Sequence, residues 1–318
     1  MDMCVKEITS SKEKNIFYTD VINGLSQGQK KLLPKYFYDE SGCKIYKEIT
    51  ELEEYYLTRT ETRLLTDIEN ELIEQLTNVA SIIEYGGGSG ERTEILVKAL
   101  DQLSHYVPID VAEDQLCSTA ESIGSVRPEI EVQPLLGSFE DLPTLSSELP
   151  GPHLGFLPGS TIGNFEYNEA KTFLRRIRKQ LNNNAYLLMG YDLVKDPDVL
   201  VRAYDDKEAV TARFNLNLLA RINRELDGNF DLNCFKHSAH FNSDKNRIEI
   251  HLVSTKDQVV KVADKEFSFS ENESIHTENS HKYTLPSITG LLSGTQWNVA
   301  SNWFDENKYY GMILLQAA

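Results

Sequence analysis

The sequence predicts an α/β fold in which a mostly parallel sheet, covered by helices, ends in a C-terminal antiparallel hairpin and is accompanied by a smaller α+β domain. From residue 79, short apolar runs alternate with helical patterns, and strands that alternate with helices form parallel sheets. This alternation breaks after Asp192. Because single cores stop growing near about 250 to 300 residues, a chain of 318 residues is expected to carry a second domain.

The elements of the main sheet follow from hydrophobic periodicity. Between Ala170 and Leu181, apolar residues stand at offsets 0, 3, 4, 7 and 11, which is one face of an amphipathic helix. The predicted strands are Val79–Tyr85, His105–Asp110, Ile130–Leu136, His153–Leu157 and Ala185–Tyr191, and the predicted helices are Glu91–Leu100, Glu113–Ile123, Ala170–Leu181 and Pro286–Leu292. The closing hairpin is expected from Gln296–Trp303 and Tyr309–Gln316.

The second domain is expected to combine an N-terminal segment with an insertion. Residues 198–226 predict one or two helices. Arg247–Ser254 alternates strictly between apolar and polar residues, as in a strand with one buried face. The predicted domains are 61–197 plus 286–318, which would bind the cofactor, and 16–60 plus 198–285, which would bind the substrate, with 1–15 as a loose tail.

The composition narrows the possible partners. With 32 Lys and Arg against 49 Asp and Glu, the formal net charge is −17, which repels nucleic acids and anionic membranes. The first residues lack a basic start and an apolar stretch, and no window is apolar enough for a membrane span, so a cytoplasmic protein is expected. The four cysteines lack CxxC spacing, which predicts reduced thiols and no metal. We expect a monomer that acts on a small molecule.

A glycine-rich segment gives the sharpest local signal. Residues 84–90 read EYGGGSG and fit ExGxGxG, with Glu84, Gly86 and Gly88 at the fixed positions. Glycine suits a sharp turn whose backbone approaches a ligand. The third glycine of a dinucleotide-binding GxGxxG would fall at Glu91, so the pattern favours S-adenosylmethionine (SAM) over NAD.

An acidic residue supports this cofactor. Asp110 closes the second predicted strand about 20 residues after the glycines, where a carboxylate can accept hydrogen bonds from both ribose hydroxyls. The alternative is a tight turn between strand and helix followed by an incidental aspartate. Four glycines in five positions disfavour that alternative, because glycine costs conformational entropy. The sequence therefore predicts SAM as the cofactor and S-adenosylhomocysteine as its product.

Several long strings resemble the histidine Nα-methyltransferases of ergothioneine biosynthesis over roughly residues 30–318. The strings are LPKYFYDESGCKIYKEITELEEYYLTRTE, EYGGGSGERT, YVPIDVAED, FLPGSTIGN, DLVKDPDVLVRAYDD and NSDKNRIEI. The resemblance implies the Rossmann-like sheet of class I SAM-dependent methyltransferases. It also implies the transfer of three methyl groups from SAM to the α-amino nitrogen of histidine, which gives the betaine hercynine.

The resemblance also implies which residues contact the cofactor. They are Gly86, which lies in the glycine segment, and Arg92, Asp110, Ser138, Phe139, Gly159 and Ser160. The family usually has Asp before Phe139, where an acid meets the adenine amino group, but this chain has Ser138. We therefore expect adenine recognition to shift partly to backbone groups.

The substrate contacts implied by the resemblance are Tyr38, Tyr55, Asn164, Tyr204, Ile250, Glu278 and Ser280. Asn164 would orient the α-amino group, and Tyr55 with Tyr204 would hold the carboxylate. Glu278 with Ser280 would hold the imidazole, and a carboxylate selects a ring that carries an N–H.

Two further residues bear on catalysis and specificity. Tyr38 could relay the proton of the amine, and its ring could stabilise the growing ammonium together with Phe37. Ile250 stands where the histidine enzymes commonly carry Met, and isoleucine is stiffer than methionine. Ile250 would therefore tighten the pocket around imidazole, or indicate a related substrate such as tryptophan or a modified histidine.

Other interpretations remain open at this stage. The tyrosines can be core aromatics, Asn164 a left-handed turn residue, and Glu278 a solvated acid. The spacing of Cys234, His237 and His240 would bring metal ligands together on a helix, but no fourth ligand is evident. The competing functions are methylation of another amino acid and SAM binding without catalysis.

Overall fold

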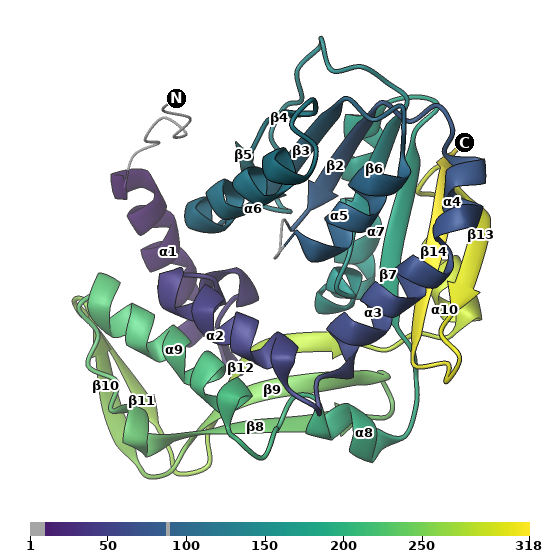
Figure 1. Ribbon diagram of the computed structural model, residues 1–318. Coiled ribbons are helices and arrows are strands. Elements are labelled where there is room, and N and C mark those ends of the chain that lie inside the picture. The colour runs from purple at the N-terminus through teal and green to yellow at the C-terminus, as the bar shows by residue number, and fades with distance from the viewer. Residues whose placement is uncertain (1–9, 87–89) are drawn as a thin grey trace. The chain divides into compact units, whose positions relative to one another are not determined.

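The computed structural model describes residues 10–86 and 90–318 and divides the chain into two compact units (Figure 1). Among these residues, the first unit contains Leu57–Lys195 and His281–Ala318, and the second contains residues 10–56 and Asp196–Ser280. No helix within the described ranges is long and apolar enough to cross a membrane.

The first unit is built on a mixed sheet with strand order β13-β14-β7-β6-β2-β3-β4, and β5 also pairs with β3. Its strands are β2 (Ser81–Tyr85), β3 (His105–Asp110), β4 (Glu131–Val132), β5 (Leu135–Leu136), β6 (His153–Leu157), β7 (Tyr186–Asp192), β13 (Trp297–Phe304) and β14 (Tyr310–Ala317). The strands from β2 to β7 pair in parallel, whereas β14 runs antiparallel to β7 and to β13. The predicted parallel sheet with a closing hairpin is confirmed.

Helices cover both faces of this sheet (Figure 1). They are α3 (Tyr56–Asp67), α4 (Glu69–Gln75), α5 (Glu91–Ala99), α6 (Glu113–Val126), α7 (Tyr167–Leu181) and α10 (Leu285–Leu291), with a 3-10 turn η2 (Thr161–Asn164) before α7. The predicted apolar face of α7 is buried from Ala170 to Leu181, and its first turn carries a capping box between Glu166 and Glu169. The helix therefore forms where periodicity and capping agree.

One predicted strand is wrong in detail. Ile130–Leu136 was expected to be continuous, but the structure has two short strands, β4 and β5, that pair with opposite ends of β3. Pro134 lies between them. Because proline has no backbone N–H, it cannot continue the ladder of a sheet.

The second unit combines a sheet of order β1-β12-β9-β8 with a separate β10-β11 pair and flanking helices. Its elements are α1 (Ser10–Leu25), β1 (Lys30–Lys31), η1 (Pro34–Phe37), α2 (Glu40–Glu51), α8 (Pro197–Arg202), α9 (Val210–Glu225), η3 (Leu232–Cys234), β8 (Phe235–Asn242), β9 (Arg247–Ser254), β10 (Gln258–Val262), β11 (Lys265–Phe269) and β12 (Ser274–His281). The helical prediction for 198–226 is confirmed as two helices.

The alternation predicted for β9 is present with one exception. Ile248, Ile250 and Leu252 are buried on one face. Arg247 is also buried, although its position in the pattern predicted exposure, because its guanidinium pairs with the Glu249 carboxylate at 2.7 Å. Burying a charged group costs free energy, and this cost is offset only when the group is paired.

Candidate cofactor and substrate sites

The carboxyl ends of the parallel strands in the first unit carry most of the predicted cofactor residues. The strand β2 lies between β3 and β6, so the strand order reverses at β2. Ligands of open α/β sheets bind outside the carboxyl ends at such a point. Gly86 follows β2, Asp110 closes β3, and Gly159 follows β6.

The backbone of this region has the conformations that the glycine pattern predicts. Gly86 and Gly90 have φ of +86° and +80°, in the left-handed region that favours glycine. A Cβ on Gly86 would lie 3.5 Å from the Phe139 ring, so the backbone approaches that side chain closely. Gly88 lies outside the described residues.

Asp110 and the turn after β6 suit an adenosine. The Asp110 carboxylate is half-buried, and its Oδ1 accepts the N–H of Ala112 at 2.9 Å, which fixes its orientation. Gly159 and Ser160 have φ of +74° and +56°, so two consecutive residues are left-handed. The oriented Asp110 carboxylate can accept hydrogen bonds from ribose hydroxyls, which fits the adenosine part of SAM.

The Ser138–Phe139 pair is held by local contacts. The Ser138 hydroxyl accepts the N–H of Asp141 at 3.2 Å. The Phe139 ring packs against Phe173 and Phe165, with centroid distances of 5.0 and 5.9 Å. Phe139 is therefore part of an aromatic cluster, and a role for either residue in adenine recognition stays a prediction.

Glu84 lies in the interior of the first unit. Its side chain accepts a hydrogen bond from the Tyr106 hydroxyl, and the residue is 1% exposed. Burial raises the pKa of Glu84 to about 7, although the hydrogen bonds from Tyr106 and Thr93 act in the opposite direction. Glu84 is consequently protonated in mildly acidic conditions.

This raised pKa predicts a pH dependence of stability. A folded-state pKa of about 7 against a usual 4.5 means that the folded protein holds the proton more tightly, so stability present at low pH is lost as the pH rises from 4.5 to 7. Relative to the Glu84→Gln variant, the wild type is expected to lose up to about 3 kcal/mol of unfolding free energy over this range. Chemical denaturation of both proteins between pH 4.5 and 8 measures the difference.

A matched variant separates this effect from the general loss of a carboxylate. Glu91→Gln removes an exposed glutamate at the start of α5. Two outcomes would contradict the raised pKa of Glu84. In the first, the unfolding free energies of the wild type and Glu84→Gln change in parallel with pH. In the second, the difference between them is no larger than the difference between the wild type and Glu91→Gln.

A buried charge cluster adjoins the turn after β6, and the sequence did not predict it. The Asp192 carboxylate pairs with Lys195 at 2.5 Å and with Lys282 at 2.7 Å. The backbone N–H of Asp192 donates to the Ser160 hydroxyl at 2.9 Å. Burial opposes the charge on Asp192, but the two ammonium groups outweigh it and lower the pKa of Asp192. The cluster thus anchors Ser160 from the end of β7.

Several predicted substrate residues lie together in the second unit. The rings of Tyr55 and Tyr204 meet edge to face with centroids 6.1 Å apart. The hydroxyls of Tyr204 and Ser280 are 2.8 Å apart. Glu278 stands two residues before Ser280 on β12, so both side chains lie on the same face of the strand.

Ile250 and Asn164 have well-defined places. Ile250 is 3% exposed on β9, the strand next to β12, and its carbonyl accepts from the Thr277 hydroxyl at 3.1 Å. Asn164 belongs to the first unit and ends η2. Asn164 is a turn residue, as the alternative expected, but its φ is not positive; the left-handed residue of this turn is Ser160.

The aromatic residues near Tyr38 differ from those expected. Tyr38 contacts the rings of Tyr46 and Phe214, at centroid distances of 5.6 and 5.7 Å. Phe37, the ring expected to face the ammonium with Tyr38, is 1% exposed and stacks on Phe214 at 4.7 Å. Tyr46 and Phe214 therefore accompany Tyr38, and the sequence did not single out either of them.

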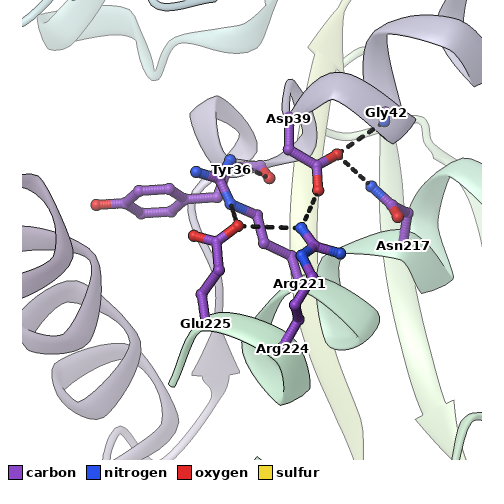
Figure 2. Close-up of polar contacts among 7 residues, drawn as sticks. All are labelled: Tyr36, Asp39, Gly42, Asn217, Arg221, Arg224 and Glu225. Carbon is purple, nitrogen blue, oxygen red and sulfur yellow. Dashed lines mark hydrogen bonds and ion pairs between the residues drawn. The ribbon is translucent and has the colours of Figure 1, made fainter. Parts of the chain in front are cut away.

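The segment that carries Tyr38 is fixed to α9 by Asp39 (Figure 2). Asp39 caps α2 by accepting the N–H of Gly42 at 2.7 Å, and it also accepts from Asn217 at 2.8 Å and from Arg224 at 2.5 Å. Burial opposes the charge on Asp39, but these hydrogen bonds outweigh it and lower its pKa. Because Asp39 directly follows Tyr38, these hydrogen bonds also restrain the backbone at Tyr38.

The structure gives no support to a metal at Cys234, His237 and His240. Cys234 ends a 3-10 turn and the two histidines lie on β8, so the spacing of three is not helical. His237 uses its two ring nitrogens toward Tyr204 O and Asn215 Nδ2, at 2.8 and 3.0 Å. Among residues 10–86 and 90–318, no group of three or more His, Cys, Asp or Glu side chains could hold a metal ion.

The sheet order, the glycine turn after β2 and the acid at the end of β3 define a class I SAM-dependent methyltransferase fold. A solved SAM-dependent methyltransferase from Clostridium acetobutylicum has this fold: it aligns with a TM-score of 0.50 and 11% identity over 86% of this chain and 98% of its own. The chain matches the family described as "Histidine-specific methyltransferase, SAM-dependent" over residues 17–317, and it belongs to that family. The resemblance inferred from the motifs is confirmed, as is SAM as the cofactor.

Two curated relatives of similar length support this assignment. The histidine N-alpha-methyltransferase of Mycolicibacterium smegmatis is 37% identical over 310 residues, which cover 93% of each chain. That of Mycobacterium tuberculosis is 37% identical over 302 residues, again with 93% of each chain covered.

Proposed function

We propose that this enzyme transfers methyl groups from SAM to the α-amino nitrogen of L-histidine, and that it adds three of them to give hercynine, as in ergothioneine biosynthesis. The observation that carries the proposal is the group formed by Tyr55, Tyr204 and Ser280, with Glu278 on the same face as Ser280. Buried hydroxyls and a carboxylate match a zwitterionic substrate with a polar ring. Membership of the histidine-specific family supports the choice of histidine.

We propose separate roles for the two predicted domains. Residues 61–197 and 286–318 bind SAM, and residues 16–60 and 198–285 bind the amino acid. When bound, SAM supplies a methyl group attached to a sulfonium. The residues that would hold it are Gly86, Gly88, Arg92, Asp110, Ser138, Phe139, Gly159 and Ser160, and the buried Glu84 would support the glycine segment that follows it.

The tyrosines are suited to bind the substrate carboxylate as hydrogen-bond donors. Burial raises the pKa of Tyr55 well above its usual value, and the nearby hydroxyls of Tyr46 and Tyr204 act in the same direction. The Tyr55 hydroxyl therefore keeps its proton at neutral pH. Glu278 accepts an N–H from the imidazole, and a substrate ring without that donor would lose this hydrogen bond, at a cost of about 1 to 3 kcal/mol.

The amine must be neutral to attack a methyl group, and it must be held in line with it. Asn164 orients the amine, and Tyr38 relays its proton to solvent. The rings of Tyr38, Tyr46 and Phe214 lie within 6 Å of one another and provide aromatic faces for the methylated ammonium that grows with each transfer. Because these aromatic faces stabilise the cation, repeated methylation needs no additional negatively charged side chain.

The proposal is tested by incubating the purified protein with SAM and each of the twenty amino acids, followed by mass spectrometry. Histidine is expected to gain up to three methylene units, with the singly and doubly methylated forms appearing first. Samples without SAM serve as controls. Methylation of tryptophan instead of histidine would contradict the choice of substrate and would indicate that Ile250 sets the specificity. Binding of SAM without any methylated product would indicate a non-catalytic protein.

A further inference from the structure

A buried glutamate connects two parts of the cofactor site in the first unit. Glu61 lies on α3 and is 0% exposed. Its carboxylate pairs with Arg92 Nη1 at 2.5 Å. Both of its oxygens also accept the backbone N–H of Gly159, at 2.9 and 3.0 Å. One carboxylate thus holds the side chain of one predicted cofactor residue and the backbone of another.

The residues around Glu61 donate hydrogen bonds to its carboxylate and leave space for it. The Tyr310 hydroxyl donates to Oε1 at 2.9 Å, so three different residues donate to one side chain. A Cβ on Gly190 would lie 2.0 Å from Glu61 Oε1 and 2.5 Å from the Tyr310 hydroxyl. The Glu61 carboxylate and the Tyr310 hydroxyl therefore occupy the space that a side chain at position 190 of β7 would need.

The two groups that Glu61 holds stand at different strand ends. Arg92 is in the first turn of α5, which follows the glycine segment after β2. Gly159 follows β6 and has φ of +74°, and it precedes the left-handed Ser160. A guanidinium carries five N–H donors in a planar fork, so its orientation decides which ligand atoms it can meet. Because Glu61 binds both Arg92 and the Gly159 N–H, it sets the orientation of the guanidinium relative to the Gly159–Ser160 turn.

We propose that Glu61 is a positioning residue for SAM, which it serves by fixing Arg92 and the Gly159–Ser160 turn in register with each other. This inference rests on the proposed role of Arg92, Gly159 and Ser160 in binding SAM. Glu61 itself is fully buried and acts through these residues. Without it, Arg92 and the Gly159 N–H lose a shared acceptor, and the binding site must order them when SAM arrives.

The test is the affinity for SAM of Glu61→Gln, measured by calorimetry without amino acid. Glutamine has one acceptor oxygen and a donating amide where the carboxylate has two acceptors, so at least one of the donors from Arg92, Gly159 and Tyr310 loses its partner. The dissociation constant is expected to rise roughly tenfold or more. Glu71→Gln, which alters an exposed glutamate hydrogen-bonded to Trp303, is the matched control and should stay within about twofold.

A double-mutant cycle separates positioning from a merely structural role. If Glu61 acts largely through Arg92, adding Glu61→Gln to Arg92→Gln should raise the dissociation constant by less than about threefold. Additive effects in this cycle would overturn the proposal. So would an unchanged affinity of a folded Glu61→Gln variant that has only a lower Tm.

A milder variant keeps the proposal testable if Glu61→Gln does not fold. Tyr310→Phe removes one donor to the carboxylate and keeps both the ring and the charge of Glu61. We expect it to raise the dissociation constant for SAM about two- to fivefold, and an unchanged value would count against the positioning role. If the wild type itself bound no SAM, the proposed cofactor site would fail as well, so the two failures are distinguishable.

Discussion

Asp110→Ala is expected to weaken SAM binding roughly 30- to 150-fold, which corresponds to a loss of about 2 to 3 kcal/mol. The residue ends β3 beside the strand where the sheet order reverses, and its carboxylate is oriented by the N–H of Ala112. A carboxylate there can accept hydrogen bonds from two ribose hydroxyls, and charge-assisted bonds are stronger than neutral ones. Calorimetric titration with SAM measures the loss directly.

Two further variants sharpen this prediction. Asp110→Asn can keep the hydrogen bond from Ala112 through its amide oxygen but loses one acceptor, so an intermediate loss is expected. Asp101→Ala removes an exposed aspartate of the same unit and should leave the affinity within about twofold. A dissociation constant for Asp110→Ala close to that of Asp101→Ala would contradict the assignment of Asp110 to the ribose.

The elements that the sequence predicted are those whose signals are local. Apolar spacing predicted α7, strict alternation predicted β9, and glycines marked the turn after β2. Each of these signals lies within a dozen residues, so one segment contains all the information needed. The prediction of one continuous strand over residues 130–136 is wrong because Pro134 has no backbone N–H to continue the ladder, although the segment is apolar.

The supporting residues of the cofactor site were missed because their partners are distant in sequence. Glu61 is separated from Arg92, Gly159 and Tyr310 by 31, 98 and 249 positions. A local signal was nevertheless present: Leu57, Glu61, Leu64 and Leu65 form one face of α3, and all four are buried. A charged residue on such a face requires a buried partner. Only the tertiary structure shows which residues supply it.

The substrate residues show a different limit. Tyr55, Tyr204, Glu278 and Ser280 were singled out by resemblance, and a spacing within the sequence relates only Glu278 and Ser280, which are two residues apart. The structure adds the hydrogen bond between Tyr204 and Ser280 and the shared face of Glu278 and Ser280. It also replaces Phe37 by Tyr46 and Phe214 as the aromatic neighbours of Tyr38. Their roles in binding histidine remain predictions that mutagenesis can decide.

Glu278→Ala is expected to lower kcat/KM for histidine roughly 100- to 1000-fold and to leave SAM affinity within about twofold. The variant removes a charge-assisted hydrogen bond, worth about 1.5 to 3 kcal/mol, and also leaves an imidazole N–H unpaired in the pocket. A loss of 100- to 1000-fold corresponds to about 2.8 to 4.2 kcal/mol, at and above the upper end of this range, because the unpaired N–H is buried in the pocket. Steady-state kinetics with histidine, combined with calorimetry for SAM, measure both quantities.

Two further variants in the same unit show whether the Glu278 carboxylate selects histidine. Glu271→Ala removes an exposed glutamate of the same polar stretch and should leave the kinetics unchanged. Glu278→Gln keeps an acceptor for the ring and should lose less than Glu278→Ala, because only the charge is removed. If Glu278→Ala methylated histidine normally, the carboxylate would not face the imidazole. If it methylated an apolar amino acid better than the wild type does, Glu278 would select histidine by disfavouring side chains that cannot donate a hydrogen bond to its carboxylate.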